Sequence, residues 1–148
     1  MSTGPYARVE RLLGPELLHI ENPIELHERI AAGLPRRTMV YLIDGMTILT
    51  LAEIFGALNM SSRTWHRIKA DKLRSAPLNA DQSARVWNLA EVLAMAEEVV
   101  GSREDAEAWL ATRAIGLNSR RPIDLLATPQ GAELVKTLLE RIAHGVYT

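Results

Sequence analysis

The chain has 148 residues, 47% of them hydrophobic and 24% charged, and a formal net charge of −1, a balance typical of one or two small globular domains with a hydrophobic core. It contains no cysteine, so disulfides and thiolate metal sites are excluded. No apolar run is long enough to cross a membrane, and the first 14 residues lack the hydrophobic stretch of a signal peptide, which predicts a cytoplasmic protein.

The N-terminal part is predicted to form three short helices. The first spans residues 6–13, where apolar side chains recur at helical spacing. The second begins after Asn22, which is a capping residue followed by proline, with Glu25 three positions after the cap. It ends before Pro35, because proline cannot continue a helix. The third covers residues 36–44 and ends at an Asp-Gly pair.

Residues 50–72 are predicted to form two further short helices joined by a tight turn. Thr50 and Glu53 have the spacing of a capping box, which starts the first of them. Its buried stripe is expected to comprise Leu51, Ile54, Phe55 and Leu58. Asn59 tolerates the left-handed conformation that ends a helix, so the turn is expected there.

The second helix of this pair is basic. Ser61 or Ser62 can cap it, and Trp65 and Ile68 are expected to point into the core. Residues 61–74 carry five cations and one anion, a net charge of +4, whereas the rest of the chain carries 12 cations and 17 anions, a net charge of −5. A solvated helix could carry these charges without binding a partner. A short helix, a turn and an exposed basic helix, however, form the plan of a helix-turn-helix, whose second helix enters the DNA major groove.

The exposed residues of the basic helix have expected roles on duplex DNA. Hydroxyl groups and free backbone N–H groups at its start suit phosphate, arginine side chains match the O6 and N7 atoms of guanine, and lysine side chains suit phosphate. The histidine suits either. The predicted DNA-binding residues are Ser61, Ser62, Arg63, Thr64, His66, Arg67, Lys69 and Lys72.

The C-terminal part is also expected to be helical. A break at residues 75–79 precedes a long helix that begins after Asn79, has one apolar face and ends at Gly101. Ser102 caps the next helix, a loop and a single helical turn follow, and a last helix opens at the Thr-Pro pair of Thr128. No alternating strand pattern of useful length occurs. The fold class is therefore predicted to be all-α.

Enzymatic sites are not indicated by the sequence. No two of the four histidines are spaced as in a metal-binding helix, and neither a glycine-rich phosphate loop nor a nucleophile elbow occurs. The acidic runs at residues 97–98 and 104–107 are interpreted as solvated side chains or as charges that favour a helix start. The chain is thus predicted to be a non-enzyme without cofactor or metal.

Several short motifs after residue 77 together resemble the C-terminal domain of the Xre/MbcA/ParS-type antitoxins. The matching pieces are Leu-Asn-Ala-Asp-Gln-Ser-Ala-Arg at 78–85, Ala-Glu-Ala-Trp-Leu at 106–110, Arg-Pro-Ile-Asp-Leu-Leu at 121–126, Thr-Pro-Gln-Gly-Ala-Glu-Leu-Val at 128–135 and Arg-Ile-Ala-His-Gly-Val at 141–146. In that family the domain follows an Xre-like helix-turn-helix. The resemblance implies a division into residues 1–35 of unnamed role, a helix-turn-helix region at 36–76 and a toxin-binding domain at 77–148.

The resemblance also implies a function. Such antitoxins are typically encoded beside a RES-domain toxin that consumes NAD or ADP-ribosylates a target, block its active site with their C-terminal end, and repress their own operator. The residues implied in toxin binding are Arg141, His144, Gly145, Val146, Tyr147 and Thr148. A stand-alone helix-turn-helix repressor without a toxin, and an adaptor whose basic helix never meets DNA, are the alternatives.

A homodimer is expected, because helix-turn-helix proteins usually bind two half-sites. The helices predicted within residues 22–46 could form the shared interface, or they could belong to the core of one monomer. Phe55 stands where many helix-turn-helix segments have a small residue, so its ring is expected to push the two helices apart or to change their crossing.

Overall fold

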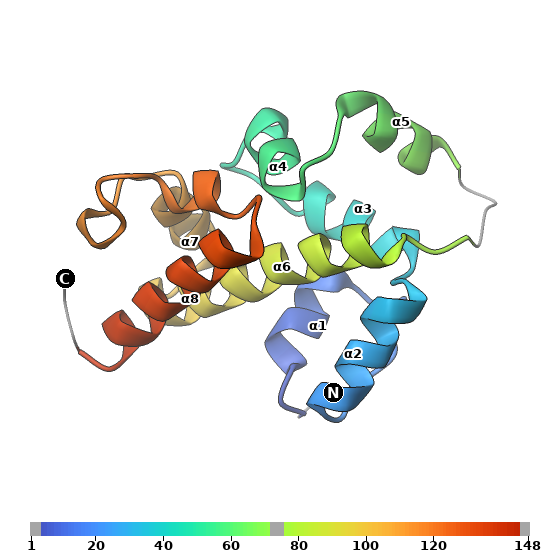
Figure 1. Ribbon diagram of the computed structural model, residues 1–148, viewed down its shortest axis with the longest axis horizontal. Helices are drawn as coiled ribbons and strands as arrows, with labels where there is room; N and C mark the ends of the chain where they lie inside the picture. The colour runs from blue at the N-terminus through green and yellow to red at the C-terminus, as the bar shows by residue number, and fades with distance from the viewer. Residues whose placement is uncertain (1–3, 72–75, 146–148) are drawn as a thin grey trace.

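The computed structural model describes residues 4–71 and 76–145, and within these ranges the chain is a set of helices joined by turns and loops (Figure 1). Its α-helices and 3-10 helices are α1 (Ala7–Leu13), α2 (Pro23–Ala32), α3 (Arg36–Asp44), α4 (Leu51–Leu58), α5 (Ser62–Ala70), α6 (Ala80–Val100), α7 (Arg103–Leu110), η1 (Ile115–Leu117), η2 (Pro122–Leu125) and α8 (Pro129–Ala143). The β-structure of the described part is a single bridge between Ala114 and Arg120. The prediction of an all-α fold is confirmed.

Six of the α-helices begin where the sequence predicts because a side chain caps each of these starts, whereas α1 and α3 begin without a side-chain cap. The side chains of Asn22, Thr50, Ser61, Asn79, Ser102 and Thr128 each accept the backbone N–H of the residue three positions later. This bond satisfies one of the N–H groups that a helix start leaves without an intrahelical partner. Asn59 ends α4 with a positive φ of 49°, as the left-handed turn requires.

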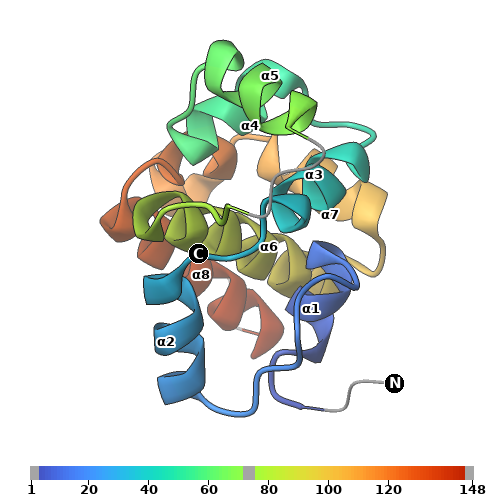
Figure 2. The same ribbon diagram turned by 90° about the vertical axis from the view of Figure 1, so that its right-hand side faces the viewer.

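The long helix α6 runs through the middle of the molecule (Figure 1; Figure 2). It packs against α1, α2, α3, α4, α7 and α8. The sequence predicted a single apolar face, but α6 is buried on several sides because neighbours surround it. Its buried residues are Ser83, Val86, Trp87, Leu89, Ala90, Val92, Leu93, Ala94 and Ala96.

One predicted core position in α4 is wrong. Leu51 is 49% exposed, and Ala57 instead joins Ile54 and Leu58 in the core. Phe55 is half-buried, with its ring centroid 6.3 Å from that of Trp65 in α5. The phenyl ring therefore fills space between the two helices.

The helix-turn-helix region contacts the C-terminal part directly, since α4 packs against both α6 and η2. The division of the chain at residues 35 and 76 stays a prediction. None of the helices in the described ranges is both long enough and apolar enough to span a membrane.

Candidate functional site

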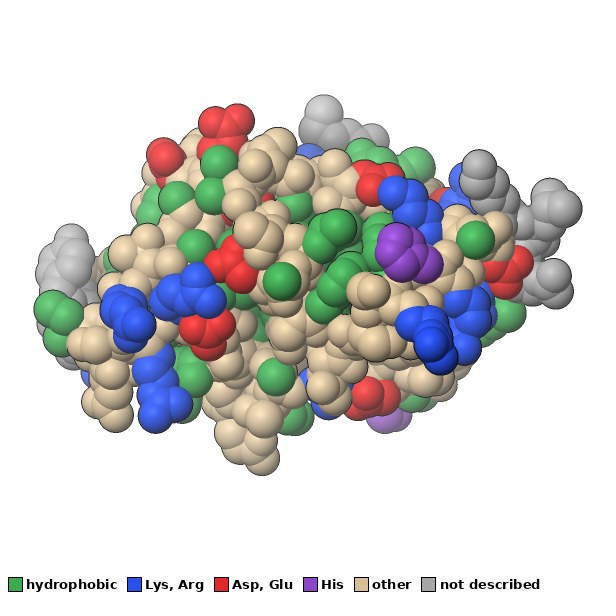
Figure 3. Space-filling view, turned by 90° about the horizontal axis from the view of Figure 1, so that it is seen from above, with side chains coloured by type: hydrophobic (Ala, Val, Ile, Leu, Met, Phe, Trp, Pro, Cys, Tyr) green, Lys and Arg blue, Asp and Glu red, His purple; other side chains and the backbone are tan. Residues whose placement is uncertain are grey.

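The basic helix α5 is anchored by two side chains and exposes the rest. Trp65 and Ile68 are 3% and 4% exposed, as the sequence predicts. Lys and Arg side chains gather over α5 on the face shown in Figure 3. The predicted DNA-binding residues on the exposed side are Ser61, Ser62, Arg63, His66, Arg67 and Lys69, with Thr64 half-buried. Lys72 lies outside the described residues.

The cations of α5 differ in their surroundings. The Lys69 amino group lies 3.9 Å from an Asp44 carboxylate oxygen and 5.5 Å from the centroid of the Trp65 ring, which directs it toward the end of α3. Among the described residues, neither Arg63 nor Arg67 has an ion-pair partner. These two guanidinium groups are therefore available to an anionic ligand.

The hydroxyl groups at the start of α5 also differ. The Ser61 hydroxyl accepts the Thr64 N–H at 3.1 Å and donates to the Thr64 side-chain oxygen at 3.0 Å. Both hydroxyls are thus engaged in the cap. Ser62 is exposed at the first position of the helix, where a hydroxyl and the helix N-terminus together suit phosphate.

The side chains at the C-terminal end of α8 are largely exposed. Arg141, His144 and Gly145 are exposed, and the His144 Nδ1 atom lies 2.7 Å from the Glu140 carbonyl oxygen, so the ring closes the helix end. Val146, Tyr147 and Thr148 lie outside the described residues. A shallow groove of about 600 Å³ runs between the ends of α6 and α8 and is lined by Met95, Glu98, Val99, Leu139, Glu140, Ile142, Ala143 and His144.

Glu107 was interpreted from the sequence as part of a solvated acidic run, and that interpretation is wrong. Glu107 is fully buried in α7. Its two carboxylate oxygens accept the backbone N–H groups of Thr47, Ile48 and Leu49 at 2.9 to 3.2 Å. A carboxylate on a run of backbone N–H groups is a strong hydrogen-bond acceptor. Glu107 therefore fixes the connection between α3 and α4, and the sequence carries no local signal for this contact.

Arg121 forms a second link between the two parts of the chain. Its guanidinium donates to Glu53 of α4 at 2.6 Å and, by two bonds of 2.9 Å, to Asp124 of η2. The pKa of Arg121 is raised above its ordinary value, chiefly by the hydrogen bonds to Asp124 and Glu53. The pKa of Glu53 is lowered, first by the backbone N–H of Thr50, with the Thr50 hydroxyl and Arg121 adding to the effect and partial burial opposing it.

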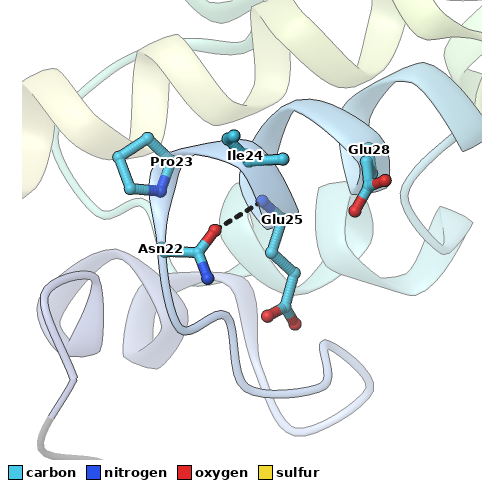
Figure 4. A pocket seen from close by; sticks show the side chains of 5 residues that line it. All are labelled: Asn22, Pro23, Ile24, Glu25 and Glu28. Carbon is cyan, nitrogen blue, oxygen red and sulfur yellow. Dashed lines mark hydrogen bonds between the residues drawn. The ribbon is translucent and has the colours of Figure 1, made fainter.

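Helix α2 is attached to the body without a fully buried residue of its own. A hollow at its start is lined by Asn22, Pro23, Ile24, Glu25 and Glu28 (Figure 4). Ile24 on this rim is 73% exposed. Among the residues that the structure describes, no three His, Asp or Glu side chains are grouped so that they could hold a metal ion.

Two family models match this chain. Residues 25–91 match the antitoxin Xre-like helix-turn-helix domain, and residues 95–145 match the antitoxin Xre/MbcA/ParS C-terminal toxin-binding domain. The boundary between the matches falls within α6, the helix shared by both parts.

Individual relatives of the chain belong to the same family as the two matched domains. The chain is 30% identical to an antitoxin Xre of Pseudomonas putida over 94% of its own length and 82% of the relative. It is 33% identical to an antitoxin Xre of Yersinia enterocolitica over 66% of this chain and 64% of that one, and 28% identical to a Prs ADP-ribosylating antitoxin of a Sphingobium species over 64% and 63%. The chain therefore belongs to the Xre/MbcA/ParS antitoxin family, with an Xre-like helix-turn-helix followed by an all-helical toxin-binding domain.

Proposed function

We propose that this chain is the antitoxin of a type II toxin-antitoxin system that blocks the active site of a RES-domain toxin and binds its own operator DNA. The observation that carries the proposal is that one chain contains both an exposed cationic helix and a toxin-binding domain. The last helix of that domain has an exposed C-terminal end. One part suits duplex DNA, and the other suits a protein.

The toxin-binding part of the proposal concerns the end of α8. Arg141, His144 and Gly145 are exposed there, and the proposed contact also includes Val146, Tyr147 and Thr148, which lie outside the described residues. An exposed helix end can enter the mouth of a catalytic site, where it would exclude substrate. The RES-type chemistry rests on the family resemblance, and the ADP-ribosylation in the name of the Sphingobium relative supports an NAD-dependent toxin.

The DNA-binding part concerns the outer face of α5. Arg63 and Arg67 are exposed and suit guanine edges, whereas Ser62 and Lys69 suit phosphate. Trp65 has the structural role of holding α5 against the body, because it is buried. It is therefore not proposed to stack on a base.

A homodimer completes the proposal. A two-fold symmetric dimer presents two copies of α5 to two half-sites, which one small helix alone does not. The exposed apolar side chain of Ile24 on α2 supports placing the dimer contact there.

The decisive experiment is co-purification of this chain with the protein encoded by the adjacent gene. Full-length chain should retain that protein and suppress its NAD-consuming or ADP-ribosylating activity, and a variant that ends at Glu140 should not suppress it. Suppression that is undiminished in the shortened variant would refute the role of the C-terminal end.

A stand-alone helix-turn-helix repressor is the second candidate, favoured by the same cationic α5. Gel shifts with upstream DNA at two salt concentrations test DNA binding in both cases. Operator binding by a chain that associates with no neighbouring gene product would favour the repressor.

A further inference from the structure

The connection between α7 and η2 contains a small closed loop, residues 113–120, that is held rigidly by its own backbone. Ala114 donates to the Arg120 carbonyl at 3.0 Å and accepts from Ser119 at 2.9 Å, and the Arg113 guanidinium donates to the Ser119 carbonyl at 3.0 Å. Asn118 and Ser119 both have a positive φ, of 56° and 60°, which reverses the chain. The loop therefore has a defined shape.

Two apolar side chains of this loop have opposite surroundings. Leu117 is 7% exposed and anchors the loop in the core, where η1 packs against α8. Ile115 is 85% exposed, the highest value among the large exposed hydrophobic side chains of the described residues. A rigid loop that presents an aliphatic side chain to water has no folding advantage from it, because burial is what makes such a side chain stabilising.

The charged residues that neighbour Ile115 in the sequence are all basic. Residues 111–121 contain three arginines and no acidic residue. Arg121 is neutralised by Glu53 and Asp124, whereas Arg113 and Arg120 are exposed beside the loop tip. Figure 3 shows Lys and Arg side chains gathered at this end of the face, away from those over α5.

The loop lies at the same end of the long axis of the molecule as the C-terminal end of α8 (Figure 1). It also falls within residues 95–145, which match the toxin-binding domain. The loop therefore lies at the same end of the molecule as the region proposed to bind the toxin.

We propose that the 113–120 loop is a second anchor for the toxin, with Ile115 entering an apolar hollow on the toxin that is bordered by carboxylates facing Arg113 and Arg120. This inference rests on the proposed antitoxin function. A preformed loop binds with little loss of conformational entropy, arginine is enriched at protein interfaces, and an aliphatic side chain can serve as the anchor that fills a pocket on the partner. Duplex DNA would also suit the two arginines, so loss of operator binding is one of the outcomes that the test distinguishes.

The test is the affinity of full-length chain for the RES-domain protein encoded beside it, measured by biolayer interferometry. Ile115→Asp should raise the dissociation constant about tenfold or more, mainly through faster dissociation, and Ile115→Ala should have a smaller effect of the same sign. Arg120→Glu should slow association and weaken its salt dependence. Leu18→Asp, at a site 71% exposed in the N-terminal part, is the matched control and should bind as the unaltered chain does.

The outcomes separate this inference from the proposed function. If the unaltered chain does not bind the toxin, the proposed function fails. If it binds and Ile115→Asp binds within twofold of it, only the loop anchor is overturned. A variant that loses operator binding or dimerisation instead of toxin affinity would assign the loop to DNA or to a second copy of the chain, which also overturns the inference. Circular dichroism of each variant establishes that it is folded.

Discussion

Glu107 and Leu49 are 58 residues apart in the chain, yet a carboxylate oxygen of Glu107 accepts the Leu49 N–H at 2.9 Å in a buried environment. The same carboxylate accepts the N–H groups of the two preceding residues. The toxin-binding domain therefore supplies the acceptor that shapes the approach to α4, the first helix of the helix-turn-helix. Arg121 also joins the two parts of the chain, because its guanidinium donates to Glu53 of α4.

Replacing Glu107 by alanine should destabilise the whole fold. Three backbone N–H groups would lose their acceptor, and each buried unsatisfied donor costs about 1 to 3 kcal/mol. We expect the free energy of unfolding, measured by urea denaturation, to fall by about 3 kcal/mol or more. Glu104→Ala, an exposed acidic position on the same helix, should change it by less than about 0.5 kcal/mol. Equal effects of the two variants would contradict the structural role of Glu107.

Glu53 should make stability depend on pH in the acidic range. Its pKa is lower in the folded chain than its ordinary value, so its stabilising contribution is fully present above roughly pH 5 and is lost as the pH falls through the folded-state pKa. The unfolding free energies of the unaltered chain and Glu53→Gln should therefore differ most near neutral pH and converge as the pH falls below the folded-state pKa of Glu53. A difference that is constant from pH 7 to pH 3 would count against this account. Glu133→Gln on the exposed side of α8 is the control.

Operator binding should report the different roles of the α5 cations. If each subunit contacts about four phosphates, log K should fall with log salt with a slope of about −3.6 per subunit. Lys69→Ala should reduce that slope by about 0.9 and weaken binding to all sequences alike. Arg67→Ala should cost about 1 to 3 kcal/mol and relax specificity at one base pair. These effects can be measured by fluorescence anisotropy, with Arg8→Ala in α1 as the control. A salt-insensitive affinity would argue against phosphate binding by α5.

Ile24→Asp should convert the proposed dimer into a monomer. The side chain is 73% exposed on α2, so the substitution removes apolar contact area from the interface without disturbing the monomer core. We expect a halved molar mass in light scattering coupled to gel filtration, with a circular dichroism spectrum like that of the unaltered chain. Ile115→Asp, on the opposite part of the chain, should remain dimeric. Dimerisation that persists in Ile24→Asp would place the interface elsewhere.

The helix boundaries and the outward face of α5 were predictable because their causes are local. A cap such as Thr50 needs only a side chain and an N–H three residues away, and the inward positions of Trp65 and Ile68 follow from helical spacing. The exposure of the residues predicted to bind DNA on α5 follows from the same spacing. Their binding to DNA stays a prediction.

The surroundings of individual side chains were less predictable. Leu51 fits a buried stripe by spacing, but the elements of the described ranges cover only about half of it, and it is 49% exposed. Glu107 fits a solvated acidic run, but the connection between α3 and α4 covers it. In both cases the burial of the side chain depends on elements that are distant in sequence. The spacing of residues within one helix carries no information about those elements.

The sequence by itself determined the all-helical class, the helix starts and the family, since each depends on residue types at short, readable separations. The tertiary structure alone decided that α6 is enclosed on several sides, that Glu107 and Arg121 join the two parts of the chain, and that the 113–120 loop presents Ile115 at the same end as the bare terminus of α8. The physical reason is that burial and long-range hydrogen bonds are properties of the packed arrangement of helices, which no single helix contains.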